Sequence, residues 1–264
     1  MQELHSIDSQ SPVLVSREDS VGVIRLNRPE KRNALDLTMR QALAESFRLL
    51  TADEQIRAIV ITGGDKVFAA GADLNLLVDK GPQQVSNIDL GQYWAPLANC
   101  PKPVIAAVSG HALGAGCELT LMCDIVVADS TTRLGQTECN VGIMPGAGGT
   151  QRLIRAVGKP VASLMLMTGE IITGERAYQS GLVSELVEDG KTIDRAMKLA
   201  QRAARMPPLA LAAIKRSLTQ GAELPLNEAL TMENREFLLL FDTQDKTEGM
   251  RAFLEKRKPE FSGQ

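Results

Sequence analysis

Short runs of aliphatic and β-branched residues alternate with segments of helical periodicity through about residue 190. The runs predict strands at 13–16, 21–27, 58–62, 67–70, 104–108, 125–128 and 182–187. An apolar stripe after Asp36, a residue suited to the N-cap, predicts a helix to about Leu50. Shorter helices are expected to start near Ala115 and to cover 150–157, 161–168 and 174–179. Segment 81–90 is polar and aperiodic, which predicts a loop or a frayed helix, and 110–116 is expected to be a turn.

From Thr192 onward the pattern is helical only, with predicted helices at 192–205, 209–220, 225–241 and 245–256. Strands and helices in alternation, followed by helices alone, predict an α/β core with a helical appendage. We expect residues 1–200 to form the core and residues 201–264 to form a C-terminal helical oligomerisation region.

Composition narrows the possible partners. The chain has 264 residues, enough to bury a full core, but aromatic residues make up only 3% and the net charge is −3. Few stacking side chains and no overall positive charge argue against a nucleic-acid partner. The N-terminus lacks the features of a secretory signal, and no apolar run approaches the roughly 18 residues that span a bilayer. We therefore expect no membrane association and a cytoplasmic location.

Cysteine and histidine usage gives no metal-binding pattern. The four cysteines form no C-x-x-C pair and are expected to be reduced, mostly buried thiols: Cys100, Cys117, Cys123 and Cys139. The spacing of a His/Cys metal site is absent, so no metal is expected. Only two histidines occur, and His5 lies in an N-terminal tail that is predicted to be disordered.

Two glutamates in glycine-rich settings are the strongest candidates for chemistry. Glu118 ends the run Gly-Ala-Gly-Cys-Glu, and Glu138 ends Gly-Gln-Thr-Glu, which a second glycine-rich stretch at 142–149 follows. One carboxylate can accept a proton while the other donates one. The alternative for each is an ordinary solvated carboxylate.

Two small-residue turns after strands are candidates for backbone donors. In the first, at 68–74, the N–H of Ala72 is the expected donor, and an ordinary tight turn is the alternative. In the second, at 105–118, a strand leads through a turn to a helix N-terminus, where unpaired N–H groups favour an oxyanion. Ser109 and His111 in this stretch are weak candidates for a hydrolase pair, because a turn serine and a surface histidine are more common.

Three cations, Arg28, Lys31 and Arg32, lie in the loop after the second predicted strand. They could hold phosphate groups or form an ordinary solvated basic loop, and the sequence leaves both interpretations open.

Taken together and in this order, these stretches resemble the enoyl-CoA hydratase/isomerase (crotonase) superfamily, from Asn27-Arg-Pro to the segment 248–257. The whole of 105–124 fits the long family signature. Within the family, the likeness is to bacterial short-chain enoyl-CoA hydratases and to the 2,3-dehydroadipyl-CoA hydratases of phenylacetate degradation. The resemblance implies an α/β, crotonase-like spiral of ββα units, with C-terminal helices that build trimers, usually paired as hexamers.

The resemblance also implies roles for individual residues. The catalytic carboxylates would be Glu118 and Glu138, and the oxyanion-hole donors would be the N–H groups of Ala72 and Ala115. Coenzyme A would lie along Arg32, Ala34, Leu35, Ala70, Gly71, Asp73 and Leu74, and against Phe253 and Lys256 of a neighbouring subunit. No metal or redox cofactor is implied. Ala115 stands where many relatives carry glycine, but alanine keeps the backbone donor.

The expected activity is reversible addition of water to a trans-2-enoyl-CoA, as in fatty-acid β-oxidation. The alternatives within the family are a Δ3-Δ2-enoyl-CoA isomerase, a decarboxylase or a hydrolase of acyl-CoA. Many isomerases use one carboxylate, so the presence of both Glu118 and Glu138 favours hydration. Some relatives bind AU-rich RNA, which the net charge of −3 disfavours. A scaffold with an inactive site is disfavoured by the intact glutamate pair.

Overall fold

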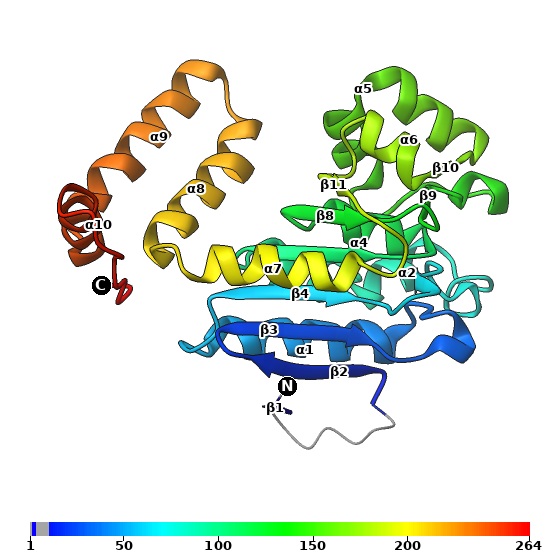
Figure 1. Ribbon diagram of the computed structural model, residues 1–264. Helices are drawn as coiled ribbons and strands as arrows, with labels where there is room; N and C mark the ends of the chain where they lie inside the picture. Colours follow the sequence, from blue (N-terminus) through cyan, green and yellow to red (C-terminus); the bar gives the residue numbers. More distant parts are fainter. Residues whose placement is uncertain (1, 4–10) are drawn as a thin grey trace.

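The computed structural model describes residues 2–3 and 11–264, so the predicted disorder around His5 lies outside the described residues. Within this part of the chain the strands form two sheets (Figure 1). The larger sheet has, in spatial order, β1 (Gln2–Glu3), β2 (Val13–Glu18), β3 (Val21–Leu26), β4 (Ala58–Thr62), β6 (Val104–Val108), β8 (Ile125–Ala128) and β11 (Glu185–Leu186). The smaller sheet has β10 (Ile171–Thr173), β9 (Arg133–Gly135), β7 (His111–Leu113) and β5 (Val67–Ala69).

Helices follow the strands and then continue alone. They are α1 (Leu37–Ala52), α2 (Pro82–Ile88), α3 (Gly91–Ala98), α4 (Ala115–Leu121), α5 (Gly149–Thr168), α6 (Gly174–Gln179), α7 (Thr192–Ala204), α8 (Pro208–Gln220), α9 (Leu226–Leu240) and α10 (Gln244–Leu254). Short 3₁₀ helices cover Pro29–Lys31, Leu74–Leu76, Glu138–Val141 and Gly221–Glu223. None of the helices in the described ranges is both long and apolar enough to cross a membrane.

From β4 to β9, successive strands alternate between the two sheets. β4, β6 and β8 pair in parallel in the larger sheet, while β5, β7 and β9, which directly follow them, pair in parallel in the smaller one. Helices then return the chain to the larger sheet, as α4 does between β7 and β8. This repetition of two strands and a helix is the predicted spiral of ββα units, and it confirms the α/β class.

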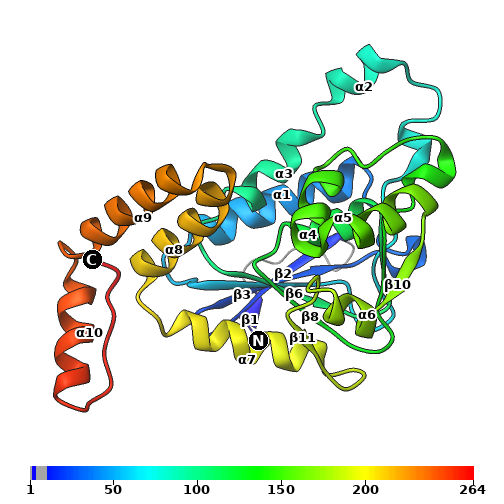
Figure 2. The same cartoon turned by 90° about the horizontal axis from the view of Figure 1, so that it is seen from above.

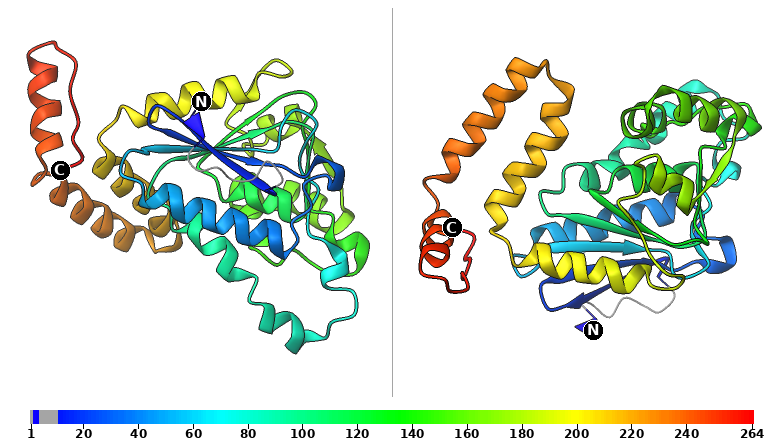
Figure 3. Two further views of the ribbon diagram at one scale, coloured as in Figure 1. Left: turned by 90° about the horizontal axis from the view of Figure 1, so that it is seen from below. Right: turned by 45° about the horizontal axis from the view of Figure 1, so that its top comes forward.

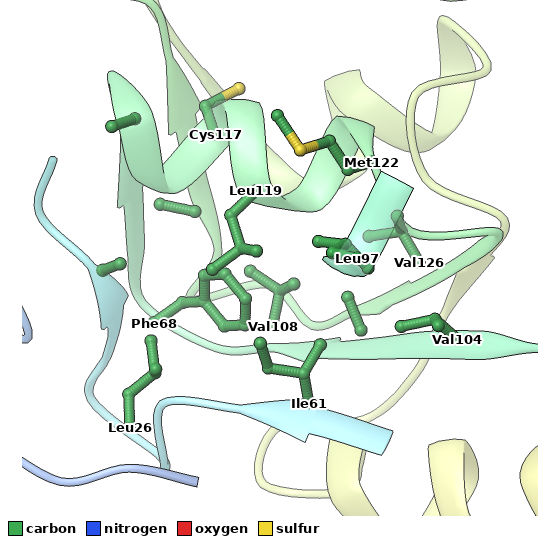
Figure 4. Close-up of a cluster of buried hydrophobic side chains, with 14 of the residues drawn as sticks. Leu26, Ile61, Phe68, Leu97, Val104, Val108, Cys117, Leu119, Met122 and Val126 are labelled. Carbon is green, nitrogen blue, oxygen red and sulfur yellow. The ribbon is translucent and has the colours of Figure 1, made fainter. Parts of the chain in front are cut away.

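The central strands are buried on both faces, which explains their continuous apolar sequences. Ile61 and Val108 belong to the core cluster that α1, α3 and α4 cover, and Figure 4 shows Leu119 of α4 directed toward them. The neighbouring residues Val60 and Ala107 face the opposite side, where α7 supplies small residues: Ala196, Ala200 and Ala204. The period of two along each strand therefore separates the two cores.

Most predicted elements are present, with some corrections. Asp36 caps α1 as predicted, its carboxylate accepting the N–H of Met39 at 2.8 Å. The segment expected as a turn at 110–116 contains β7, because pairing with β5 and β9 extends it. The two helices expected at 150–157 and 161–168 are both present, and they meet within α5 at Gly158, where φ is 73° and ψ is 166°. Segment 82–88 is helical, the predicted strand at 182–187 is reduced to β11, and β9 and β10 were not predicted.

The C-terminal helices lead away from the core beyond the end of α7 (Figures 1 and 2). No residue of α9 is buried within the chain. Large apolar side chains are instead exposed along α9 and α10: Leu226, Leu230, Phe237, Leu238, Leu239, Met250, Phe253 and Leu254. The position of the boundary at residue 200 stays a prediction.

Candidate active site

The two expected oxyanion donors lie on adjacent loops. β5 and β7 pair in parallel, so the segments that follow them leave the same edge of the small sheet. At Gly71, φ is 110°, and a Cβ atom there would lie 3.0 Å from the carbonyl oxygen of Leu113 and 3.9 Å from the nitrogen of Ala115. Among the described residues, no acceptor is bonded to the N–H of Ala72 or of Ala115. Two unpaired donors therefore stand next to each other.

Helix α4 approaches the small sheet closely because its first turn contains Gly116. A Cβ atom on Gly116 would lie 2.1 Å from the carbonyl oxygen of Ala69, a distance that only glycine avoids. This contact sets the first residue of the helix, Ala115, beside the 70–74 loop. The unpaired N–H groups and the positive end of the helix dipole favour negative charge at this point.

Glu118 is held by the start of another helix. It lies in the first turn of α4 and only 3% of it is exposed. Its Oε1 accepts the N–H groups of Ala147 and Gly149 at 2.7 and 2.8 Å. Burial raises the pKa of Glu118, while these two hydrogen bonds act in the opposite direction by stabilising the carboxylate. The hydrogen bonds fix Oε1 and leave the other oxygen available for a proton.

Glu138 enters the same region from the small sheet, in the 3₁₀ helix after β9. A Cβ atom on Gly114, which precedes α4, would lie 3.1 Å from its Oε1. Burial raises the pKa of Glu138 to about 7, and the nearby negative charge of Glu118 adds to the rise. With its amide nitrogen facing this carboxylate, the buried side chain of Gln136 donates to both oxygens at 3.3 and 3.2 Å.

One cavity of about 330 Å³ joins these groups. Its lining includes Ala72, Ala115, Glu118 and Glu138, together with Arg40, Leu77, Lys80, Val85, Leu90, Trp94, Ile143, Met144, Gly146 and Ala147. A larger hollow of about 530 Å³ lies beside α8, but its lining contains only one carboxylate, Glu54. Two carboxylates and two unpaired backbone donors in one cavity supply acid–base chemistry and oxyanion stabilisation together.

The residues expected along coenzyme A form two strips that touch. The N–H of Ala70 donates to the carbonyl of Arg32 at 3.0 Å, and the N–H of Leu35 donates to the carbonyl of Gly71 at 2.8 Å. Arg32 is exposed and Ala34 is half-buried, whereas the side chain of Leu35 is fully buried. Leu35 can therefore offer a ligand only its backbone.

The remaining expected coenzyme A residues fall into two places. The carboxylate of Asp73 accepts the N–H of Asn75 at 3.0 Å, and the next residue, Leu74, is 45% exposed at the same loop. Phe253 is exposed in the last turn of α10, and Lys256 is exposed just after it. This helix, red in Figures 2 and 3, lies well away from α4 in the green core. One chain does not bring these two residues to the cavity, so their contact from a neighbouring subunit stays a prediction.

Other candidates have structural roles. Arg28 forms an ion pair with Asp36 at 2.7 Å and is thereby engaged within its own loop, while Lys31 and Arg32 are exposed. Ser109 is buried and donates to Asp129 at 2.7 Å, whereas His111 is exposed, so they do not form a nucleophile–base pair.

All four cysteines are unpaired, two of them buried and two half-buried. In residues 2–3 and 11–264, no group of three potential metal ligands is arranged to hold an ion.

Several residues of the site were not predicted. Asn33 is fully buried and its amide donates to the carbonyls of Val67 and Phe68 at 3.2 and 3.0 Å, which ties the 28–36 loop to β5. Gln136, Arg40 and Trp94 were also missed. Gln136 directly precedes the Thr-Glu pair that ends in Glu138, and Arg40 interrupts the apolar face of a predicted helix, so both had a weak signal in the sequence.

The fold and the cavity define an α/β protein of the crotonase class. Its sequence matches the enoyl-CoA hydratase/isomerase family over residues 16–264, and the chain belongs to that family. It is 48% identical to the 2,3-dehydroadipyl-CoA hydratase of Escherichia coli (strain K12), over 96% of this chain and 99% of that protein. It is 42% identical to a probable enoyl-CoA hydratase of Rhizobium meliloti (strain 1021), over 96% and 98%. Enoyl-CoA hydratase subunit I of Geobacillus kaustophilus HTA426 superposes with a TM-score of 0.93 at 40% identity, over 96% and 98%.

Proposed function

We propose that this protein catalyses the reversible addition of water to a trans-2-enoyl-CoA, giving a 3-hydroxyacyl-CoA. The observation that carries the proposal is the pair Glu118 and Glu138 in one cavity with the unpaired N–H groups of Ala72 and Ala115. Relatives that are 42–48% identical over nearly the whole chain and are named as hydratases support the same reaction.

The backbone donors would act on the thioester carbonyl. When water attacks Cβ, negative charge moves to the thioester oxygen and an enolate forms. Donors directed at that oxygen bind the transition state more strongly than the ground state. Each donor of this kind contributes about 3–4 kcal/mol. The start of α4 adds the favourable end of a helix dipole at Ala115.

The two carboxylates would divide the proton transfers. Glu118, whose Oε1 is fixed by two N–H groups, uses its other oxygen to take a proton from the attacking water. Glu138, with a pKa of about 7, holds a proton near neutral pH and gives it to Cα. The water oxygen bonds to Cβ, the double bond electrons take up the proton at Cα, and exchange with solvent restores both carboxyl groups. No cofactor enters this scheme.

The coenzyme A part would hold the substrate in place. Its path follows the touching strips Arg32–Leu35 and Ala70–Leu74, with Phe253 and Lys256 from a neighbouring subunit completing it. Such positioning can contribute roughly 7–11 kcal/mol to lowering the barrier. The unpartnered apolar side chains of α9 and α10 support assembly as a trimer, or as a hexamer made of two trimers. The Escherichia coli relative is named for 2,3-dehydroadipyl-CoA, and a role in phenylacetate degradation rests on the family resemblance alone.

The test is turnover of trans-2-enoyl-CoA esters, followed by loss of enoyl-thioester absorbance, for the wild type and Glu138→Gln. We expect rapid loss with the wild type and a decrease of about 10²–10⁴-fold in the variant, with ester binding retained. A folded wild-type protein that binds the esters without hydrating any of them would reject hydration and favour isomerisation or hydrolysis. Near wild-type turnover in Glu138→Gln would reject the role of Glu138.

A further inference from the structure

Arg40 is a buried cation on the wall of the catalytic cavity. It lies on α1, and only 3% of it is exposed. Its Nε donates to the carbonyl of Leu35 at 2.8 Å, and its guanidinium carbon stands 4.8 Å from the centre of the Trp94 ring. Within the described ranges, its two Nη groups have no acceptor and no carboxylate comes within ion-pairing distance.

A buried arginine without a carboxylate partner is unusual, because removing a charge from water is costly. Burial lowers the pKa of Arg40 to about 10, so the side chain stays protonated at neutral pH. Asp36 pairs with Arg28, and Glu118, whose negative charge acts favourably on Arg40, forms no ion pair with it and accepts two backbone N–H groups through Oε1. The cation therefore has unused capacity to bind an anion.

A second donor beside Arg40 also lacks a partner. The indole N–H of Trp94 has no acceptor among the described residues. The indole nitrogen of Trp94 has almost no surface accessible to solvent, whereas the Nη groups of Arg40 retain some accessible surface where the residue lines the cavity. Apart from Lys80, Glu118 and Glu138, the other side chains that line the cavity are mainly apolar: Leu77, Val85, Leu90, Ile143 and Met144. A fatty acyl tail would cover the guanidinium without giving it a counterion, at a cost in free energy.

We propose that Arg40 binds a carboxylate at the far end of the acyl tail, so that the preferred substrates are enoyl-CoA thioesters of dicarboxylic acids. The inference rests on the proposed hydratase function, since it assigns the tail of that substrate. The phosphates of coenzyme A are a poor match, because their expected path lies along the exposed Arg32 and Leu74, outside the cavity wall. The planar guanidinium fits a carboxylate through two parallel hydrogen bonds.

The experiment compares two six-carbon substrates, trans-2-hexenoyl-CoA and its analogue with a terminal carboxylate, in the wild type and three variants. Arg40→Met removes the charge and keeps an apolar side chain of similar length. Arg40→Lys keeps the charge without the planar fork. Arg48→Met is the matched control, an exposed arginine on the same helix. Thermal unfolding verifies that each variant is folded.

The wild type should favour the carboxyl-terminated ester, and Arg40→Met should reduce the ratio of the two kcat/KM values roughly 10–100-fold. Arg40→Lys should reduce it less, and Arg48→Met should leave it unchanged. An equal loss for both substrates would overturn the proposal and make Arg40 a positioning residue for Glu118. A wild type without preference, or a ratio that responds to Lys80→Met instead, would also overturn it.

Binding separates this inference from the proposed function. The saturated analogues hexanoyl-CoA and adipyl-CoA cannot be hydrated, so titration calorimetry measures tail recognition alone. Tighter binding of adipyl-CoA that Arg40→Met abolishes would support the carboxylate site even if neither enoyl ester were turned over. Equal affinities for the two analogues would reject it even in an active hydratase.

Discussion

The backbone N–H of Gly149 donates a 2.8 Å hydrogen bond to Oε1 of Glu118. Gly149 is the first residue of α5, so the positive end of a second helix is directed at this carboxylate. A Cβ atom at Gly149 would lie only 3.0 Å from the same oxygen and 2.7 Å from Cβ of Pro145. The close approach that holds Glu118 thus depends on the absence of a side chain at residue 149.

This relationship predicts the effect of Gly149→Ala. The added methyl group should displace the carboxylate of Glu118, and a misplacement of about 1 Å can cost about 10²-fold in rate. We expect kcat to fall by roughly 10-fold or more, while the ester still binds. Gly221→Ala, at the start of another helix where the nearest atom is 3.8 Å away, should leave kcat unchanged. Unaltered turnover in Gly149→Ala would contradict the positioning role of this contact.

The pH dependence follows from the two carboxyl groups. Glu138 must carry a proton to act as the acid, and its pKa is about 7, so the hydration rate should fall as the pH rises above about 7. Glu118 must be ionised to act as the base, so the rate should also fall in acid, below the raised pKa of that group. The two apparent values belong to the coupled pair.

The measurement is kcat/KM between about pH 5 and 9 for the wild type and Glu138→Gln. The residual activity of the variant should lose the alkaline decline and keep the acidic one. An alkaline decline of the same shape in both proteins would assign it to another group.

The backbone donor of Ala72 can be removed without changing any charge. The variant Ala72→Pro lacks the backbone N–H. Because this N–H has no hydrogen-bond partner in the described part of the chain, the substitution removes no hydrogen bond from the folded protein. We expect kcat to fall about 10²–10³-fold, as for loss of one oxyanion donor. Thermal unfolding checks that the loop survives, and normal turnover from a folded variant would reject Ala72 as a donor.

The long buried strands and the capped helices of this fold could be predicted from the sequence better than its short strands. The strand at Ala58–Thr62 and the capped start of α1 at Asp36 were readable, because burial and capping each leave a local signal. β7 and β9 were not, since each has three residues and depends on pairing with distant strands. β-propensity in such short segments depends on tertiary context.

The residues of the candidate site also differ in how well the sequence predicted them. The glycine-rich settings identified Glu118, Glu138 and the donor loops, because small residues near carboxylates are visible in a sequence. The contacts that surround these groups could not be predicted from the sequence. Gln136 reaches Glu138 only through the local chain geometry. Arg40 faces the cavity only because α1 packs beside α3. Which side of a helix meets a ligand is a property of the packed structure.

The exposed face of α9 predicts how assembly affects activity. Leu239 is 68% exposed near the end of α9, where Phe237 and Phe241 are also exposed and meet edge to face, with ring centres 5.0 Å apart. Leu239→Glu would place an unpaired charge in any subunit interface here, and disruption at a central interface residue costs about 2 kcal/mol or more. Light scattering should therefore report smaller oligomers than for the wild type at equal concentration.

Activity should decrease together with assembly. If Phe253 and Lys256 of a neighbouring subunit contact coenzyme A, Leu239→Glu should raise KM for the thioester although the residue lies outside the cavity. Gln41→Glu adds the same charge to an exposed site on α1 and should change neither the mass nor KM. Dissociation removes any contact from a neighbouring subunit but leaves the cavity of each chain intact. If dissociated subunits retained the wild-type KM, each chain would bind coenzyme A without its neighbour, and the predicted contact would be rejected.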